Sequence, residues 1–290
     1  MTLRKVPSEV GVAANTILRI LGAELTFVLG TGVVFGLLLA LRLGDAVLHD
    51  PLTRMWADLL LAAVLSGSFV LYGQKLGGVP ARAFSFAFGP KDAVFALLAG
   101  ILTLGLAAGY MLLISRSGAH PITAVAPSLG LLLIGFLGEF GVLHEEVLNR
   151  GYILPLLRSR YGTAWALLVS AVLFSLSHAI FKRVDFMLVS HFLVGIALGY
   201  MYLKSGSLTL TTTVHAFHNF AADLFLQGNN NGVSLGIGVF QFSAHLGALE
   251  RLAFDLLLAL ATLGLTYWAY GRGTRFSEAS ARLPSVGTAR

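Results

Sequence analysis

Long apolar runs constrain this chain more than any other feature of its sequence. A helix rises about 1.5 Å per residue and the hydrocarbon core of a bilayer is about 30 Å thick, so one crossing needs about 20 mostly apolar residues. We place about eight such runs at Glu24–Arg42, Trp56–Gly73, Asp92–Ser115, Leu131–Leu157, Thr163–Phe181, Val184–Leu203, Leu208–Leu226 and Leu252–Tyr270. They predict an all-α fold, a polytopic transmembrane helical bundle of about eight spans.

The composition agrees with an integral membrane protein. Only 12% of the 290 residues are charged, against about 25% in ordinary soluble domains, and the mean hydropathy is +0.81. The runs are continuously apolar, whereas the strands of a membrane β-barrel alternate over about ten residues. No polar stretch is long enough for a soluble domain, so we expect residues 1–290 to form a single membrane domain in the lipid bilayer.

The basic residues are unevenly divided between the two ends of the expected spans. Lys and Arg are retained in short cytoplasmic loops. With eight spans and a cytoplasmic N-terminus, 14 of the 20 basic residues fall on the cytoplasmic side; without Arg150, which lies inside a span, the division is 13 against 6. We therefore expect both termini to be cytoplasmic. This topology accounts for the net charge of +6, and the absence of an aromatic or basic recognition motif argues against nucleic-acid binding.

Residue types further restrict the chemistry. The chain has no cysteine, which excludes disulfides, thiolate metal sites and a cysteine nucleophile. The glycine pairs Gly32/Gly36 and Gly195/Gly199 have the small-xxx-small spacing that lets helices approach closely. We expect ordinary helix packing from both pairs.

The fourth run contains the first group of ionisable residues, between His144 and Gly151. Placing ionisable groups inside a membrane costs free energy, so their presence there indicates a function. Glu146 and Arg150 are four residues apart and can pair on one helical face, while Glu145 points about 100° away. The alternative is a surface salt bridge at a helix end, but the apolar residues continue beyond the motif to Leu157.

His178 in the fifth run is expected to lie at the same depth in the membrane as Glu145. The fourth and fifth runs form a hairpin that turns near Tyr161, and Glu145 and His178 lie at similar distances from this turn. Antiparallel helices therefore bring a carboxylate and an imidazole together inside the bilayer. The seventh run adds His215 and Asn219, four residues apart on one face and at comparable depth. Three helices thus converge on one polar zone.

The remaining ionisable residues near this zone are expected to be structural. Glu139 is six residues before Glu145 and points elsewhere on a regular helix. Buried histidines usually hydrogen-bond locally, so we expect a packing role for His144, His191 and His218.

The ordered motifs Glu-Glu-x-x-x-Arg, Phe-x-x-x-His and His-x-x-x-Asn resemble the CAAX prenyl protease type 2 and bacteriocin-processing (CPBP, or Abi) family of intramembrane proteases. The resemblance covers about residues 131–226, which it marks as the catalytic core. It implies that Glu145 and His178 activate the attacking water, that His215 and Asn219 stabilise the oxyanion, and that Glu146 and Arg150 hold their helix. Many relatives have an aromatic residue where this chain has Asn149.

Two matters stay open at the level of sequence. His178, His215 and Glu145 could form a two-His, one-Glu zinc site, but no His-Glu-x-x-His motif is present, so the cofactor is zinc or none. The preferred function is an endopeptidase acting on a membrane-associated protein or peptide, in a prokaryotic plasma membrane. The alternatives are a secondary transporter or proton relay, since buried Glu and His serve these too, and a non-catalytic scaffold.

Overall fold

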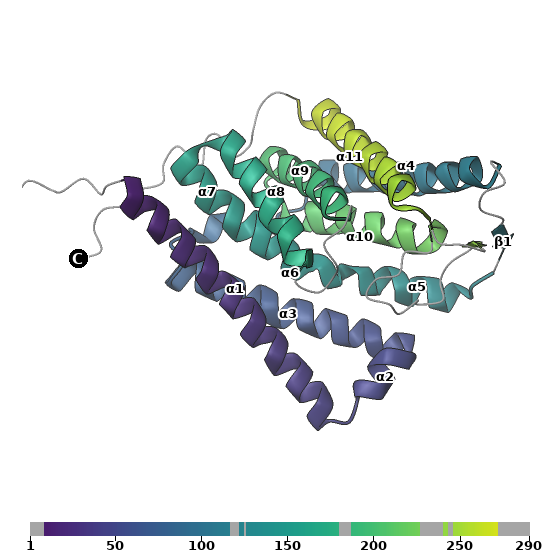
Figure 1. The fold of residues 1–290 in the computed structure, drawn as a ribbon, viewed down its shortest axis with the longest axis horizontal. Helices are drawn as coiled ribbons and strands as arrows, with labels where there is room; N and C mark the ends of the chain where they lie inside the picture. Colours follow the sequence, from purple (N-terminus) through teal and green to yellow (C-terminus); the bar gives the residue numbers. More distant parts are fainter. Residues whose placement is uncertain are drawn as a thin grey trace, which may run out of the picture.

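A computed structural model describes residues 9–116, 122–124, 126–179, 187–226, 240–242 and 246–271. Figure 1 shows the helices running mainly along one long axis. The elements are α1 Glu9–Ala40, α2 Gly44–His49, α3 Pro51–Lys75, η1 Ala81–Ala83, α4 Pro90–Arg116, β1 Ile122–Ala124, α5 Leu129–Gly138, η2 Glu139–Val142, α6 Leu143–Glu146, η3 Val147–Ile153, α7 Leu154–Tyr161, α8 Thr163–Ala179, α9 Met187–Ser205, α10 Leu208–Phe225, β2 Phe240–Phe242 and α11 Ala248–Tyr270.

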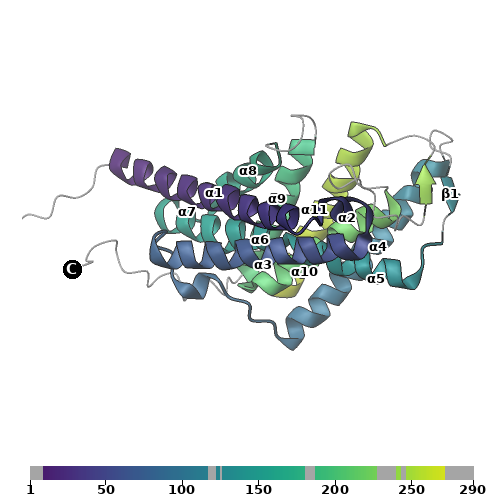
Figure 2. The same ribbon diagram turned by 90° about the horizontal axis from the view of Figure 1, so that it is seen from below.

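The predicted all-α class is confirmed. Apart from helices, the described residues contain only one short antiparallel ribbon, in which β1 pairs with β2 and Thr123 lies opposite Gln241. Helices α1 and α3 lie side by side along one flank of the bundle, as the two perpendicular views show (Figures 1 and 2). The rest of the bundle is built from three packed helix pairs, namely α8 with α9, α9 with α11, and α4 with α10.

The predicted number of spans is not confirmed. Among the described residues, five helices are long and apolar enough to cross a bilayer, namely α1, α3, α4, α9 and α11. Helix α8 is apolar but has only 17 residues, and its expected end at Phe181 and the next start at Val184 lie outside the described residues. The fourth run, Leu131–Leu157, is a series of α, 3-10 and π segments rather than one α-helix. The count of about eight spans therefore stays a prediction.

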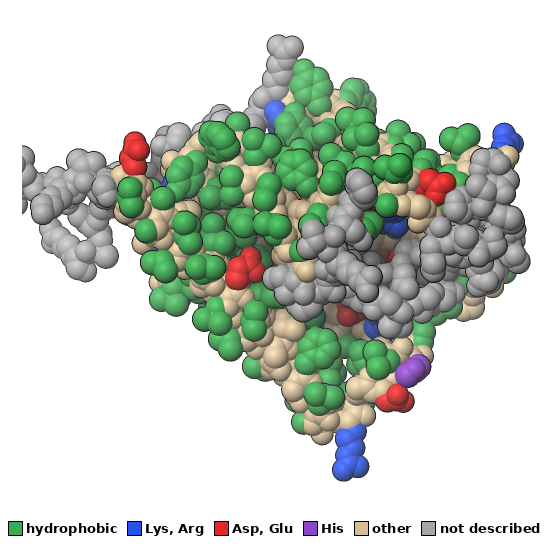
Figure 3. Space-filling view, in the orientation of Figure 1, with side chains coloured by type: hydrophobic (Ala, Val, Ile, Leu, Met, Phe, Trp, Pro, Cys, Tyr) green, Lys and Arg blue, Asp and Glu red, His purple; other side chains and the backbone are tan. Residues whose placement is uncertain are grey.

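The outer surface of the bundle is apolar, as contact with the hydrocarbon core of a membrane requires. Helix α1 leaves Leu18 and Leu39 each 68% exposed, and Trp268 on α11 is 73% exposed. Apolar side chains cover most of the described surface in the space-filling view (Figure 3). Contiguous exposed apolar area of this extent marks a lipid or protein interface, and with the five long apolar helices it identifies an integral membrane protein.

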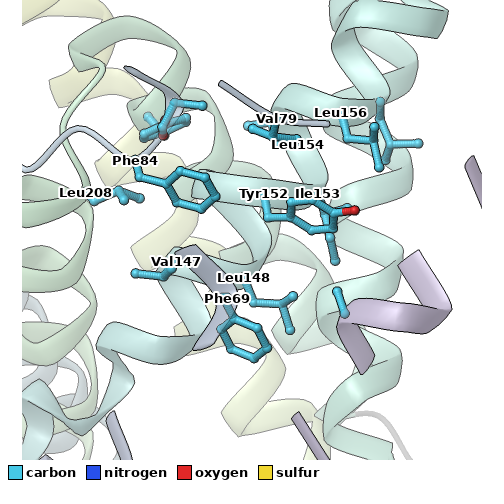
Figure 4. Close-up of a cluster of buried hydrophobic side chains, with 14 of the residues drawn as sticks. Phe69, Val79, Phe84, Val147, Leu148, Tyr152, Ile153, Leu154, Leu156 and Leu208 are labelled. Carbon is cyan, nitrogen blue, oxygen red and sulfur yellow. The ribbon is translucent and has the colours of Figure 1, made fainter. Parts of the chain in front are cut away.

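The largest buried apolar cluster lies where the loop before α4 folds against the helices (Figure 4). Phe84 from this loop packs with Tyr152 of η3 and Leu208 of α10. Gly151 permits the approach, because a Cβ there would lie 2.9 Å from Cδ1 of Phe84. Further contacts tie the loop down, since Leu208 N donates to Ser85 O at 2.8 Å and the Tyr202 hydroxyl donates to Ala83 O.

The two glycine pairs behave differently. A Cβ at Gly195 would lie 3.1 Å from Cα of Ala171 on α8, and one at Gly199 would lie 2.7 Å from Cδ1 of Leu167. The packing predicted for this pair is confirmed. At Gly32 and Gly36 a Cβ would meet no heavy atom of the described residues within 4 Å, so these two do not mediate helix contact there.

This contrast gives a stability prediction. Gly195→Val is expected to force α8 and α9 apart and to lower the free energy of unfolding by about 1–3 kcal/mol. The measurement is thermal unfolding of the purified protein in detergent. Gly36→Val is the matched control, because it introduces the same side chain into a helix without a close neighbour, and an equal loss in both variants would contradict the packing argument.

Candidate active site

A cavity of about 340 Å³ lies within the helical bundle. Its walls come from α1, α3, the series from α5 to η3, α8, α9, α10 and α11. Four residues predicted from the motifs line it, namely Glu145, His178, His215 and Asn219. The other two, Glu146 and Arg150, are not among its lining residues and are fully or almost fully buried, at 0% and 2% exposure.

Glu145 and His178 face each other across the cavity wall. Their Oε2 and Nε2 atoms are 3.6 Å apart, as the equal depth of the two motifs predicts. The Nδ1 of His178 lies 2.8 Å from the carbonyl oxygen of Phe174; since a carbonyl only accepts, Nδ1 donates and Nε2 is turned toward Glu145. A distance of 3.6 Å is too long for a direct hydrogen bond, and a water molecule can bridge it.

Glu146 and Arg150 form the predicted ion pair. Arg150 Nη1 donates to Oε1 of Glu146 at 3.0 Å, and Nη2 donates to the Gly195 carbonyl of α9 at 3.3 Å. The guanidinium group also lies 4.5 Å from the centre of the Phe174 ring. These contacts join η3 to α8 and α9, so the pair fixes the helix that carries Glu145.

His215 is held by the same carboxylate. Its Nδ1 donates to Oε1 of Glu146 at 2.8 Å, which orients the ring so that its other edge belongs to the cavity wall. Sequence spacing predicted that Glu146 would pair with Arg150 but gave no sign of this second contact. Glu146 therefore connects α6, η3 and α10 through one oxygen atom.

Asn219 lies beside an unexpected pair of carboxyl groups. Its side chain hydrogen-bonds to Glu139, which also hydrogen-bonds to Asp223. A hydrogen bond between two carboxyl groups requires a proton on one of them. The expectation that Glu139 points away from the cavity is wrong, because it lines the cavity. The cause is local, since Glu139 begins the 3-10 segment η2, where the angular spacing of an α-helix does not apply.

Three other histidines also line the cavity, although packing was expected. The ring of His191 stacks on His178 with the centroids 4.0 Å apart. His144 Nδ1 lies 2.7 Å from the Gly141 carbonyl, and His218 Nε2 lies 3.2 Å from the Thr262 hydroxyl. The predicted local hydrogen bonds are thus present for His144 and for His191, whose Nδ1 lies 2.6 Å from the Met187 carbonyl oxygen, whereas the partner of His218 lies on α11. Only the convergence of helices, which the sequence does not give, places these rings at the cavity.

The proposed zinc ligands do not fit a metal ion. Within the described residues, no group of three or more His, Asp or Glu side chains is placed to hold one. The zinc alternative with His178, His215 and Glu145 is therefore not supported, and neither is a metalloprotease-like site.

These features define a class of protein: a polytopic helical membrane protein with a polar, carboxylate- and imidazole-lined cavity inside its bundle. Comparison with known families makes the assignment more specific. Residues 127–221 match the family model described as type II CAAX prenyl endopeptidase Rce1-like. This part of the chain, which carries all six motif residues, is similar to that CAAX-type family of intramembrane proteases, the same family that the motifs resemble. None of the curated proteins compared with the chain matches it.

Proposed function

We propose that the protein is an intramembrane endopeptidase that hydrolyses a peptide bond of a membrane-associated protein or peptide. The observation that carries the proposal is the 3.6 Å approach of Glu145 Oε2 and His178 Nε2 at the wall of the cavity. A carboxylate and an imidazole at this spacing can hold one water molecule between them, which is what general-base activation requires.

In this mechanism Glu145 accepts a proton from the water as its oxygen attacks the scissile carbonyl carbon. His178 orients the water through Nε2 in its neutral ring. The carbonyl oxygen becomes an oxyanion, to which His215 and Asn219 donate hydrogen bonds from one face of α10. When the C–N bond breaks, the proton passes from Glu145 to the departing amine. No step requires a metal ion.

Glu146 and Arg150 act as positioning residues. Arg150 ties η3 to the Gly195 carbonyl, and Glu146 holds His215 through Nδ1. A donor at Nε2 requires protons on both ring nitrogens of His215. The Glu146 carboxylate lies where it balances the charge of that ring. Glu146 and Arg150 therefore hold His215 in position to donate to the oxyanion.

The remaining parts of the proposal concern location. We assign the catalytic core to residues 131–226 of a single membrane domain, place both termini in the cytoplasm and place the protein in a prokaryotic plasma membrane. The charge division between the two ends of the helices supports the orientation. A transporter function is less well supported, because residues 127–221, which carry the polar groups of the cavity, match a peptidase family model.

The function can be tested without knowing the substrate. Membrane fractions from cells that produce wild type or Glu145→Gln are compared by proteomics that identifies peptide ends. We expect new ends within membrane-associated proteins only in the wild-type sample. Identical sets of ends, with both proteins inserted at equal levels, would contradict peptidase activity.

The oxyanion assignment gives a separate prediction. Asn219→Ala is expected to lower kcat by about 10²–10³-fold, the loss seen when one oxyanion donor is removed, with little change in KM. The measurement is steady-state cleavage of the identified substrate in liposomes. Ser177→Ala, which removes a different polar group from the cavity wall, is the control, and equal effects of both variants would contradict a specific role for Asn219.

A further inference from the structure

A carboxyl group that belongs to none of the three motifs lies at the cavity. Glu139 lines the cavity together with His215 and Asn219, and only 7% of this residue is exposed. It begins η2, the 3-10 segment that packs against α10. Burying a carboxyl group costs free energy unless it is hydrogen-bonded. The partners of Glu139 therefore indicate what this buried group does at the site.

Two hydrogen-bond partners of Glu139 come from one face of α10. Asn219 and Asp223 are four residues apart on this helix, and His215 precedes Asn219 by four, so the three share a face. The side chains of Asn219 and Asp223 each hydrogen-bond with Glu139. Asp223 is as deeply buried as Glu139, at 6% exposure. Glu139 is thus the middle member of a hydrogen-bonded chain between η2 and α10.

The contact between Glu139 and Asp223 determines which groups donate in this chain. Two ionised carboxylates in contact repel each other, and the nearby charge of Asp58 on α3 adds to the repulsion at Glu139. A hydrogen bond between two carboxyl groups instead uses one shared proton. Because the proton is used in this contact, Glu139 has only acceptor sites left for Asn219. Asn219 therefore donates an N–H of its side-chain amide to Glu139.

This donation determines how the Asn219 amide is turned. The amide has two N–H donors on its nitrogen and an acceptor on its oxygen, and a half-turn about the last side-chain bond exchanges the two sides. The reverse orientation would place the amide oxygen against an acceptor of Glu139. With one N–H held by Glu139, the second N–H of the same nitrogen stays available at the cavity wall. An amide without this contact could present its oxygen instead, which would repel a developing oxyanion.

We propose that Glu139 is a positioning residue, which holds the Asn219 amide in the orientation that donates to the oxyanion while Asp223 shares its proton. This role rests on the proposed peptidase function and adds to it a residue outside the three motifs. Glu139 does not touch the water or the scissile bond and acts through Asn219. Glu146 has the corresponding role for His215, whose Nδ1 lies 2.8 Å from its Oε1. Each oxyanion donor of α10 thus has its own buried carboxyl partner.

Removing the acceptor tests this role. Glu139→Met keeps the length of the side chain but leaves the Asn219 amide free to turn. We expect kcat for the substrate found by proteomics, measured in liposomes, to fall by about 10–100-fold with little change in KM. Glu139→Gln is expected to restore most of the lost kcat, because its amide can donate to Asp223 and accept from Asn219. A Glu139→Gln variant as slow as Glu139→Met would overturn the orienting role.

A double variant separates orientation of Asn219 from general damage to the site. Glu139→Met added to Asn219→Ala is expected to cause no further loss of kcat, because Glu139 acts only through this amide. An equal loss from Glu139→Met in both backgrounds would overturn the proposal. Glu24→Met is the matched control, since it removes another carboxyl group from the cavity wall, on α1. A loss of kcat in this control as large as that in Glu139→Met would also contradict a specific role.

The shared proton has a test that needs no catalysis. A protonated carboxyl group gives an infrared carbonyl band that differs from those of carboxylates and amides and moves when deuterium replaces the proton. We expect this band in the difference spectrum of wild type minus Glu139→Gln, because Asp223 is ionised when it accepts from the new amide. A difference spectrum without the band would overturn the carboxyl pair whether or not the protein cleaves peptides. A wild type that cleaves nothing would contradict the peptidase function instead, so the two failures are distinguishable.

Discussion

Glu145→Gln is expected to reduce the rate of peptide-bond hydrolysis by about 10²–10⁴-fold, the usual contribution of a positioned general base. The amide keeps the size of the side chain but cannot take a proton from water. The fold should be retained, because Glu145 lies outside the internal contacts that Glu146 makes with Arg150 and His215. The measurement is the single-turnover rate in liposomes, with thermal unfolding to verify the fold.

A matched control separates the site from the chemical change. Glu9→Gln makes the same substitution at an exposed position at the start of α1 and is expected to leave the rate unchanged. If Glu145→Gln and Glu9→Gln both cleave at the wild-type rate, Glu145 has no part in the mechanism.

The second large effect is expected on stability. Arg150→Met leaves the Glu146 carboxylate buried at 0% exposure without its guanidinium partner. Removing one member of a buried ion pair costs about 3–5 kcal/mol. We therefore expect a lower yield of folded protein and a marked fall in the unfolding temperature in detergent. Activity should fall as well, because the contact between η3 and the Gly195 carbonyl is lost.

The paired variant distinguishes the ion pair from simple loss of a side chain. Glu146→Gln combined with Arg150→Met removes both charges of this ion pair and is expected to recover part of the stability, since neither member of the pair is left without the other. Lys75→Met, an exposed position, controls for loss of a basic residue. A double variant that is destabilised by the sum of both single losses would show that the two residues act independently.

Helical periodicity was sufficient to predict the core of the site. The four-residue spacing predicted the Glu146–Arg150 contact, and the hairpin near Tyr161 predicted that Glu145 and His178 meet. Both predictions concern residues whose relative positions follow from distance along one helix or across one turn. The functional roles of the six motif residues stay predictions.

Contacts that depend on irregular helix geometry were not predictable in this way. Glu139 lines the cavity because a 3-10 segment begins there, and no residue type marks such a segment in advance. The seven-residue π-helix Val147–Ile153 likewise replaces the regular fourth span. The second partner of Glu146, His215, comes from a helix 69 residues later, and its register depends on tertiary packing rather than on local spacing.

The central claim is that Glu145 and His178 act on one water molecule. Cleavage rates of Glu145→Gln, His178→Ala and the double variant in liposomes test it most directly, because residues that act as a unit give strongly non-additive losses. We expect the double variant to be no slower than the slower single variant. A double variant whose loss is the product of the two single losses would contradict it.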